Sequence, residues 1–578
     1  MNFRRFPTDM SALPVDRRHL RRCLVSGWFS ETAGSGCNFC TYLAPGLEYS
    51  RPSLIITPPV EADPSEWIWK NQDLWESFAL ENKVFLHFLL SGEEEDTSGT
   101  GEGPLEMVRR ETHSRTHYVE IPDNLYLMGF GSGARAAQRT AGAHTEEYAG
   151  MALFGPFSEK LPEEGGTLTE KGLPEEAGSV PLPVWIIEQG NSAEGRSLTE
   201  FWKRRNKSEG ERFSRIEAGE AGEKESSPVF CAEEVWLSSR TERRSRDNEE
   251  PLGEVRRSRG WDGALSRALL DDVWRFLGRA ARHRGPGHKA LRRVQDPGAY
   301  GLIRRETEID GCIRIWYEYV PESARNDAEE VPLVVCMHPR GGSAETFVSL
   351  SRMNQAAEER GFIVIFPEAG VYRQKPGGLG NVPLWEGELE GRRFDDVKFI
   401  RFAVEDVCAR ERIDRTKIYA CGQSSGGMMT CSLAVRAPEL FAAVSPWSGT
   451  GNIGFGVAPP ETISPKVPFF FMMGDRDVLC SDPENGEYEF RVSSSAAVFL
   501  AGVMKAYGLE ERKAMMYRSG EISFFVYPDK RGIPMLTVGV VKNMPHGNYP
   551  RQSRLAYDEF FCKWSKKDGI LYYMGMPV

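Results

Sequence analysis

The run Lys417-Ile-Tyr-Ala-Cys-Gly-Gln-Ser424-Ser-Gly-Gly427 is the most informative part of the chain. An apolar, strand-like stretch leads into a turn of small residues, and the helix-like stretch Met428 to Val435 follows. The turn contains the pattern Gly-x-Ser-x-Gly, which in a strand, turn and helix context presents the serine as a nucleophile. Gly422 and Gly426 leave room where side chains would collide on a strained turn. The run therefore predicts an enzyme whose nucleophile is Ser424.

A serine nucleophile needs a base, and where this motif occurs the chain order is serine, acid, histidine. From residue 300 to the end the chain has two histidines, His338 and His546. His338 precedes the serine, at the end of a strand-like stretch that runs into a glycine-rich loop. His546 lies in a loop ahead of the helix-like stretch Ser553 to Lys563. We therefore predict that His546 is the general base.

The acid is expected after a strand between the serine and the histidine. The apolar stretch Val467 to Met473 reads as such a strand, and Gly-Asp-Arg-Asp follows it, with carboxylates at Asp475 and Asp477. A carboxylate here would hold the imidazole in the required tautomer and stabilise the imidazolium. The spacing Gly-x-x-Asp before Val478 favours Asp477 as the acid and Asp475 as a turn cap.

An oxyanion hole would complete the site, with one N–H from the residue after the nucleophile and one from the loop after an early strand. The first donor is Ser425. The second is expected in the loop that begins at His338, where Pro339 has no N–H to donate. Either Arg340 or Gly341 is therefore the second donor.

Further motifs follow one another in order from about residue 300 to 565. They are Pro332 to His338 with its glycine loop, Gly361 to Pro367, Trp385, Phe394 to Ile400, Ile413 to Tyr419, the serine turn, and Met544 to Gly547. This succession resembles the polyhydroxybutyrate depolymerase and feruloyl esterase group of α/β-hydrolases. The resemblance implies an α/β fold with a mostly parallel sheet and a serine carboxylesterase activity. Members of the group often have His-Gly where this chain has His338-Pro339.

The resemblance also suggests where a substrate would bind. Residues 370–396 form a long loop rich in glycine and aromatic residues, in the usual place for substrate contacts in that group. Trp385, in this loop, and Trp447, just after the strand-like stretch Phe441 to Ser445, could stack on an acyl group. Packing in the core is the alternative for both side chains.

The first half of the chain contains a second copy of the serine turn. Residues 124–135 align without a gap on residues 417–428, and the positions that carry the same residue type include Tyr126 with Tyr419, Gly129 with Gly422, and Gly133 with Gly426. Gly131 occupies the nucleophile position, and an alignment near residue 259 puts Arg259 in place of the histidine. The alternatives are an ordinary glycine turn, or an active Ser132 in a shifted frame.

Strand-like stretches around this second turn repeat the order of the later half: Ser53 to Thr57, Asn82 to Phe88 and Pro183 to Ile187. A chain of 578 residues is also about twice the length of one such domain. We therefore predict tandem α/β-hydrolase domains: a degenerate domain over residues 1–290 and a catalytic domain over residues 291–578. The degenerate half could form one side of the active-site entrance or carry a dimer contact.

Four polar segments of the first half are predicted to be loops or insertions. They are Gly92 to Gly103, the stretch 159–179, Lys207 to Ser227 and the mixed-charge run Arg240 to Arg259.

Composition indicates a soluble globular protein. Hydrophobic residues make up 40% and charged residues 27% of the chain, and the net charge is −11. These values favour neither nucleic acid nor an anionic membrane as a partner. No apolar stretch approaches the roughly 20 residues that span a bilayer, and the basic amino terminus lacks the apolar core of a secretion signal. We expect a cytoplasmic location, and a homo-oligomer is left open.

Cysteine usage agrees with that location. The count of 11 is odd, and Cys336, Cys421 and Cys431 lie in apolar stretches, as reduced buried thiols do. Cys37-x-x-Cys40 could bind a metal or act in redox chemistry, but alternating strand residues are the simpler interpretation. No metal and no cofactor are expected.

The predicted function is hydrolysis of small soluble esters, hydroxycinnamoyl, aryl or hydroxyalkanoate oligomer esters, through an acyl-enzyme on Ser424. Two other classes stay open at this point: a serine peptidase with the same triad, and a non-catalytic binding or scaffold protein.

Overall fold

A computed structural model describes most of the chain. The described residues are 3–5, 18–23, 25–33, 36–59, 61–90, 104–114, 120–157, 181–214, 230, 232–238, 252–282, 291–294, 298, 301–326, 329–373, 381–386, 388–389, 392–451, 463–477 and 494–578. They fall into two compact units. Unit 1 contains residues 3–5 and those from 22 to 294, and unit 2 contains residues 18–21 and those from 298 onward, apart from residues 375–380.

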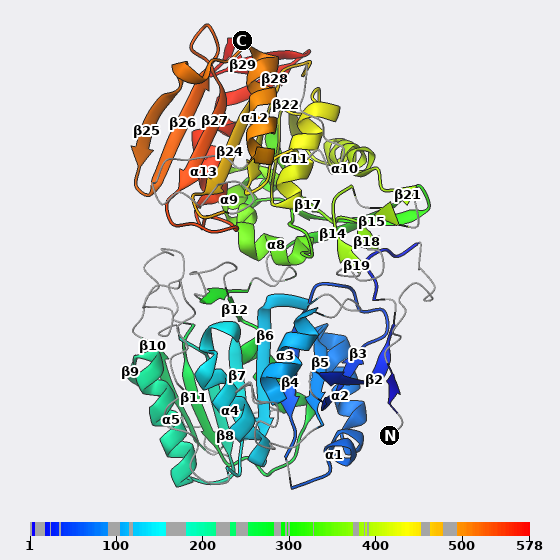
Figure 1. Ribbon diagram of the computed structural model, residues 1–578, viewed down its shortest axis with the longest axis vertical. Helices are drawn as coiled ribbons and strands as arrows, with labels where there is room; N and C mark the ends of the chain where they lie inside the picture. Colours follow the sequence, from blue (N-terminus) through cyan, green and yellow to red (C-terminus); the bar gives the residue numbers. More distant parts are fainter. Residues whose placement is uncertain are drawn as a thin grey trace. The chain divides into compact units, whose positions relative to one another are not determined.

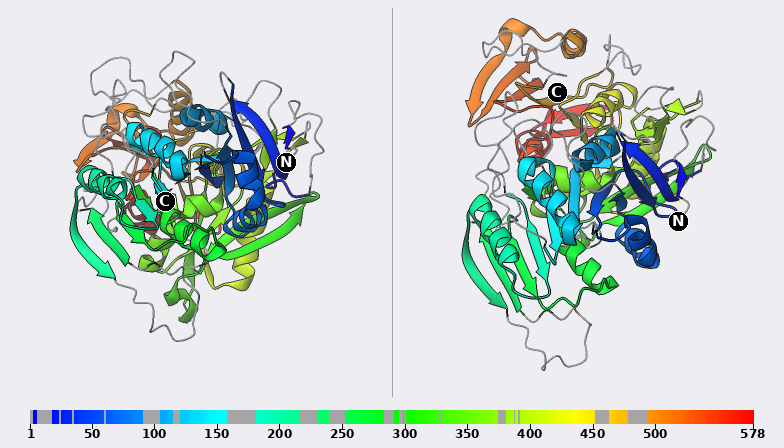
Figure 2. Two further views of the ribbon diagram at one scale, coloured as in Figure 1. Left: turned by 90° about the horizontal axis from the view of Figure 1, so that it is seen from below. Right: turned by 60° about the horizontal axis from the view of Figure 1, so that its bottom comes forward.

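Unit 1 is built on one long sheet whose strands are labelled in Figure 1. Over the described residues its order is β1-β2-β3-β5-β4-β6-β7-β8-β11-β10-β9. The strands span Arg4–Arg5 (β1), Gly27–Ala33 (β2), Cys37–Leu43 (β3), Arg51–Thr57 (β4), Phe85–Leu89 (β5), Glu120–Phe130 (β6), Gly150–Phe154 (β7), Val184–Glu188 (β8), Ser208–Ser214 (β9), Ala232–Ser238 (β10) and Val255–Arg259 (β11). Figure 2 shows β2 and β3, in blue, at one edge and β9 and β10, in green, at the other.

Helices cover both faces of the unit 1 sheet. They span Pro64–Lys70 (α1), Gln72–Asn82 (α2), Pro104–Ser114 (α3), Ala134–Ala143 (α4), Ala193–Asn206 (α5) and Arg267–Leu277 (α6). Side chains of α1, α2 and α6 share one core cluster, and side chains of α3, α4 and α5 share another. Because both faces are covered, the central parallel strands are largely apolar, as β8 is in Val-Trp-Ile-Ile before its last residue, Glu188. The short strands Ala280–Arg282 (β12) and Leu291–Arg293 (β13) form a separate pair.

Unit 2 has a sheet of its own, with the order β14-β15-β17-β16-β22-β23-β24-β27-β26-β25 over the described residues. The strands span Ile303–Ile309 (β14), Cys312–Tyr319 (β15), Val331–Met337 (β16), Ile363–Pro367 (β17), Ile413–Gln423 (β22), Ala443–Trp447 (β23), Phe469–Gly474 (β24), Met515–Ser519 (β25), Ile522–Pro528 (β26) and Pro534–Val541 (β27). The central strands from β17 to β27 are parallel, and both edges are antiparallel.

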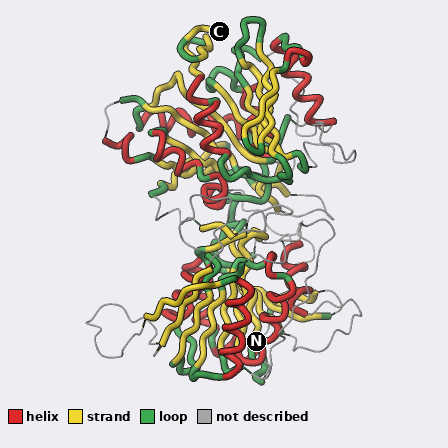
Figure 3. Tube along the Cα trace, turned by 90° about the vertical axis from the view of Figure 1, so that its left-hand side faces the viewer, coloured by secondary structure: helices red, strands yellow, loops and turns green. Residues whose placement is uncertain are grey.

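The helices of unit 2 span Glu322–Asn326 (α7), Ala344–Ser351 (α8), Met353–Arg360 (α9), Asp396–Arg410 (α10), Ser425–Arg436 (α11), Ser494–Tyr507 (α12) and Gln552–Glu559 (α13). Among them α9 packs on α13, and α10 packs on α11. In Figure 3 the strands of this unit, in yellow, lie side by side with helices, in red, around them. This mixed sheet with helices is the arrangement of an α/β-hydrolase.

Short pairs of strands complete unit 2. They are Val371–Arg373 (β18) with Asn381–Pro383 (β19), Glu388–Leu389 (β20) with Arg392–Arg393 (β21), and the group Trp564–Lys567 (β28), Ile570–Tyr573 (β29) and Met576–Pro577 (β30). The stretch 370–396, predicted as a long loop, therefore contains two small hairpins.

Two of the four predicted insertions contain sheet strands. Lys207 to Ser227 begins with β9, and the mixed-charge run Arg240 to Arg259 ends in β11, which lies inside the sheet. Arg257 lies buried in β11 with its Nε 2.8 Å from Oε1 of Glu188, so a neutralised charge lies inside the sheet where a solvated loop was predicted. Gly92 to Gly103 and the stretch 159–179 lie outside the described residues.

Cys37 and Cys40 both belong to β3, as the strand interpretation of this pair predicted. Side chains three apart on a strand point to opposite faces, and the two thiols belong to the core clusters on opposite sides of the sheet. Over the described part of the chain, no group of three or more His, Cys, Asp and Glu side chains is placed to hold a metal ion. Within the same residues, no helix has both the length and the apolar character needed to cross a membrane.

Candidate active site

Ser424 lies at the turn between β22 and α11, where the sequence predicted it. Its backbone has φ 55° and ψ −117°, a conformation that residues with a side chain rarely adopt. Its N–H donates to the carbonyl of Trp447 at 2.8 Å, and its carbonyl accepts from Met428 at 2.9 Å. Backbone bonds on both sides therefore hold the strained turn, and the serine side chain stays partly exposed.

The glycines of the turn permit close backbone contacts. A Cβ on Gly426 would collide with the carbonyl oxygen of Met337 and lie 2.7 Å from that of His338. A Cβ on Gly422 would lie 2.7 Å from the Met337 oxygen and from the Gly426 carbonyl. These contacts press the start of α11 against the end of β16, and so place the serine next to the loop that follows His338.

Replacing Gly426 by alanine is expected to lower the free energy of unfolding by about 3 kcal/mol or more, because backbone atoms crowd the added methyl group and cannot give way. Gly190→Ala is the control, since no atom lies within 4 Å of its Cβ position. That change should alter stability by less than about 1 kcal/mol. Urea denaturation of both variants would check the prediction, and equal midpoints for the two would contradict it.

His546 and Asp477 form a pair. The imidazole Nδ1 lies 3.0 Å from each carboxylate oxygen of Asp477. Asp477 is fully buried, whereas the side chain of His546 is 30% exposed. A carboxylate can only accept here, so Nδ1 carries the proton and Nε2 is left as the basic atom. Of the two candidate aspartates, Asp477 is the one in contact with the histidine. The pKa of the other, Asp475, is raised by burial.

Close contacts bring the histidine loop to the serine turn. A Cβ on Gly449 would collide with the carbonyl oxygen of Ser424, so the residues after β23 lie against the turn. The adjacent Ser448 donates from its hydroxyl to the carbonyl of Gly547 at 3.0 Å. Gly547 directly follows His546 in the chain. The serine, the acid and the histidine thus come together at the carboxyl ends of β22, β24 and β27.

The structure separates the two alternatives for the second oxyanion donor. The N–H of Gly341 donates to the carbonyl of Pro383 at 2.9 Å, so Gly341 has an acceptor within the protein. The N–H groups of Arg340 and of Ser425, the first residue of α11, have no acceptor among the residues that the structure describes. Arg340 is therefore the residue of the pair that still has an N–H to offer.

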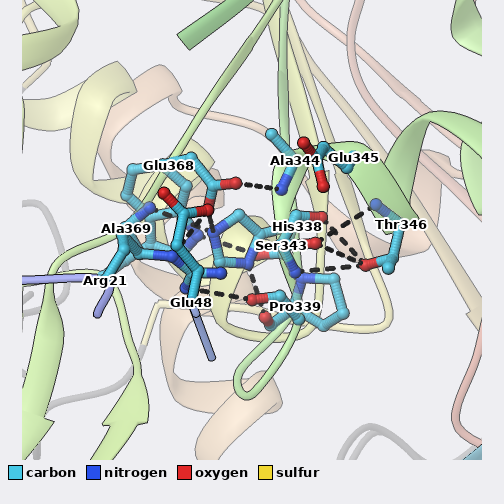
Figure 4. Close-up of polar contacts among 12 residues, drawn as sticks. Arg21, Glu48, His338, Pro339, Ser343, Ala344, Glu345, Thr346, Glu368 and Ala369 are labelled. Carbon is cyan, nitrogen blue, oxygen red and sulfur yellow. Dashed lines mark hydrogen bonds and ion pairs between the residues drawn. The ribbon is translucent and has the colours of Figure 1, made fainter. Parts of the chain in front are cut away.

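His338 is a buried, neutral residue of the same loop, drawn in Figure 4. Its Nε2 accepts from the N–H of Ala369 at 3.0 Å, and its Nδ1 lies 2.8 Å from the carbonyl oxygen of Pro339, to which it must donate. Burial, and then the positive charge of Arg21, lower the pKa of His338 to about 3. Its imidazole therefore has no free nitrogen for catalysis, in agreement with the choice of His546 as the base.

Trp385 and Trp447 are core residues, so their predicted role in substrate binding is corrected. Trp385 is 3% exposed, and its Nε1 donates to the carbonyl of His338 at 2.8 Å. Trp447 is the last residue of β23 and has no exposed surface; its Nε1 donates to the hydroxyl of Ser445 at 2.9 Å. Both indoles are held by protein partners, and neither offers a face on which an acyl group could stack.

Comparison with known proteins finds esterases. Residues 316–463 match the family described as esterase PHB depolymerase. Most of the matched residues belong to unit 2. An acetylxylan esterase of Coprinopsis cinerea is 34% identical over 139 residues, which is 23% of this chain and 34% of that protein. Feruloyl esterase B of Thermothelomyces thermophilus is 30% identical over 153 residues, 26% of this chain and 49% of that protein. The chain spans between 34% and 61% of the length of the curated relatives it matches.

The structure adds residues to this esterase-related site that sequence reasoning missed. Glu368 directly follows β17, and a carboxylate after a buried parallel strand is a signal that could have been noticed. Arg21 lies far away in the sequence, and its charge looks like part of a solvated basic amino terminus. Nothing in its local pattern indicates that it lies buried in unit 2.

Proposed function

We propose that unit 2 is a serine carboxylic-ester hydrolase. The observation that carries the proposal is the pairing of His546 with the buried Asp477, in a loop that Ser448 and Gly449 link to the strained turn at Ser424. This is the set of groups that acyl transfer requires: a nucleophile, a base and an orienting acid. The relatives of this unit are esterases, which favours an ester over a peptide as the substrate.

The reaction begins with proton transfer. Nε2 of His546 removes the proton of the Ser424 hydroxyl as its oxygen attacks the ester carbonyl, and Asp477 stabilises the imidazolium that forms. The carbonyl oxygen becomes negative in the tetrahedral intermediate. The intermediate collapses, the alcohol leaves with the proton from His546, and the acyl group stays on the serine. Water, activated by the same imidazole, then releases the acid.

The negative oxygen needs hydrogen-bond donors that are already in place. We assign this role to the N–H groups of Ser425 and Arg340, since both lack acceptors among the described residues and Gly341 is used by Pro383. Donors of this kind are typically worth about 3 kcal/mol each in transition-state stabilisation. The close packing of Gly426 on the end of β16 keeps the two donors on neighbouring segments.

The proposed substrates are small soluble esters of hydroxycinnamoyl, other aryl, or hydroxyalkanoate oligomer type. The names of the relatives support ester substrates with acetyl or feruloyl groups. The cytoplasmic location, the absence of nucleic-acid and membrane partners, and the oligomeric state stay predictions.

We also propose that unit 1 is a degenerate copy of the same domain, with the two domains over residues 1–290 and 291–578. The supporting observation is the strand order, β2-β3-β5-β4-β6-β7-β8-β11 in unit 1 and β14-β15-β17-β16-β22-β23-β24-β27 in unit 2. In each unit the fourth of these strands along the chain lies between the second and the third. An antiparallel pair, β9 with β10 or β25 with β26, then precedes the last strand.

The turns correspond as closely as the sheets. Gly131 has φ 54° where Ser424 has φ 55°. A Cβ on Gly133 would collide with the carbonyl oxygen of Pro58 at the end of β4, as one on Gly426 would with that of Met337 at the end of β16. A copy of the domain that has lost its activity would keep the backbone of the turn and lack the serine hydroxyl.

The loop of unit 1 that corresponds to the histidine loop carries no histidine among the described residues. Arg259 is a strand residue that pairs with Glu188 in the ladder of β11 and β8, so its predicted place in the histidine loop is corrected. The following loop, residues 260–266, contains no histidine. Glu61, not a histidine, accepts the hydrogen bond from the hydroxyl of Ser132 at 2.7 Å, and it lies beside Gly131.

Labelling with a fluorophosphonate probe tests both proposals. The wild type should be labelled and should hydrolyse aryl and acyl esters but not peptides, and Ser424→Ala should abolish the labelling. Adding Gly131→Ser to Ser424→Ala should restore neither labelling nor turnover, since the described loop after β11 has no histidine where unit 2 has His546. Labelling that persists in Ser424→Ala would refute the site, and turnover in the double variant would refute the degenerate copy. An unlabelled wild type would favour a binding or scaffold role.

A further inference from the structure

We propose that Arg21 is a positioning residue for the oxyanion loop of unit 2, the segment from His338 to Ala344. The inference rests on the proposed esterase function and extends it to a residue 321 positions before Gly342 in sequence. Residues 18–21 belong to unit 2, where the N–H of Ile313 in β15 donates to the carbonyl of Arg18 at 2.8 Å. This contact lays the amino-terminal segment against the sheet.

Arg21 contacts the loop directly. Its side chain is 5% exposed, and its guanidinium donates to the carbonyl of Gly342 at 3.3 Å. Its Nε lies 3.4 Å from Oε2 of Glu368, an equally buried carboxylate. The hydrogen bond to Gly342 is charge-assisted and directional. The ion pair with Glu368 is buried and therefore little screened by salt. Arg21 therefore restrains the peptide that joins Gly342 to the start of α8.

Glu368 holds the same loop from its other oxygen. Oε1 accepts from the N–H of Ala344, the first residue of α8, at 2.9 Å. The Glu368 backbone is itself fixed, since its N–H donates to the carbonyl of Ile315 at 2.9 Å and its carbonyl accepts from Arg314 at 3.2 Å. Arg21 and Glu368 thus hold the loop at Gly342 and at Ala344, one on each side of Ser343. Figure 4 shows the bond between Glu368 and Ala344.

Further hydrogen bonds hold other residues of the loop. Its first residue is held by three bonds, from Trp385 to the His338 carbonyl, from Ala369 to Nε2, and from Nδ1 to Pro339. Gly341 is bonded to Pro383. Within this frame the N–H of Arg340 is the donor left for the oxyanion, and Arg21 restrains the far side of the turn that carries it. A shift of about 1 Å in such a donor is enough to cost a hundredfold in rate.

The charge of Arg21 has a second effect, through His338. The Nε2 of His338 lies 3.5 Å from the Glu368 carboxylate, but it accepts from Ala369 and so is unprotonated. Burial keeps the imidazole neutral, and the charge of Arg21 adds to this effect, which preserves the bond to Ala369. Other charged groups near this part of unit 2 include Arg314 of β15, Asp396 of α10 and Glu345 of α8. Arg314 and Asp396 pair with each other, and Glu345 accepts from a tyrosine.

The test compares Arg21→Met, which removes the charge and keeps the bulk, with Arg18→Met as the matched control. Arg18 lies in the same segment, but its side chain is 68% exposed and pairs only loosely with Glu308, at 3.8 Å. Steady-state hydrolysis of an aryl ester is measured at pH 8, and kcat is expressed per active site titrated with the fluorophosphonate. We expect Arg21→Met to lower kcat about 10- to 100-fold with KM changed less than about threefold, and Arg18→Met to keep both values.

Expressing kcat per titrated site separates positioning from folding, because misfolded protein is not titrated. Arg21→Lys keeps the positive charge and should have a kcat between those of the wild type and Arg21→Met. It serves as the test if Arg21→Met does not fold.

A kcat per titrated site equal to the wild type in both Arg21→Met and Arg21→Lys would overturn the proposal. So would the same loss in Arg18→Met. Failure of the esterase proposal is a different result, because the wild type itself would then show no labelling and no turnover.

Discussion

Ser424→Ala should lower kcat for ester hydrolysis by a factor on the order of 10⁵ to 10⁶, which leaves only what binding and the oxyanion donors contribute. The backbone of Ser424 is already strained at φ 55°, and alanine keeps the Cβ, so the turn itself should survive. The loss of kcat therefore results from the missing hydroxyl and not from a change of the turn. Burst kinetics with an aryl ester would measure the loss of kcat, and the thermal midpoint of the variant would show whether the fold is kept.

The neighbouring Ser425 supplies a matched control. Its hydroxyl is buried and has no hydrogen-bond partner among the described residues, and its proposed contribution is the backbone N–H, which alanine retains. Ser425→Ala should therefore keep kcat within about threefold of the wild type. A Ser424→Ala protein with more than one per cent of wild-type turnover would place the nucleophile elsewhere, as would a Ser425→Ala protein that is inactive but folded.

Asp477→Asn is expected to lower kcat about 10⁴-fold near neutral pH. The carboxylate accepts the Nδ1–H of His546 through both oxygens at 3.0 Å. An asparagine can turn its amide N–H₂ toward the ring, which would then carry its proton on Nε2 and lose its basic atom. The side chains are similar in size, so the fold should be kept.

Asp475→Asn is the control for that change. Asp475 comes from the same loop, two residues earlier, and its half-buried carboxyl has a raised pKa through burial rather than through a bond to the histidine. The kcat of the Asp475→Asn protein should stay within about tenfold of the wild type. Stopped-flow acylation rates would show where the loss occurs, and equal rates for the two variants would remove Asp477 from the mechanism.

The nucleophile and the positions of its two partners could be read from local patterns. Gly-x-Ser-x-Gly between a strand and a helix predicts the turn at Ser424, and the structure has β22, the turn and α11 in that order. His546 was identified by elimination, since the second half of the chain has two histidines. Asp477 was identified by its spacing after an apolar strand. The catalytic roles of these residues stay predictions until the variants are measured.

Patterns failed where burial had to be inferred from residue type alone. Trp385 and Trp447 were expected at a substrate because indoles bind ligands well, but an indole also packs well, and both are buried. The strand β11 was predicted as a solvated loop because it contains arginines, yet Arg257 is neutralised by Glu188 from β8. Whether a side chain is covered, and by which partner, depends on segments that are distant in the sequence.

The sequence by itself determined the chemistry that rests on neighbours in the chain: the strand, turn and helix around Ser424, the order of serine, acid and histidine, and the second turn at Gly131 with its missing hydroxyl. Only the tertiary structure decided between Arg340 and Gly341, because the choice depends on a hydrogen bond to Pro383, more than 40 residues away. It alone placed Arg21 against Gly342. Local propensities act over a few residues, whereas the partner of a buried polar group is set by which segments the fold brings together.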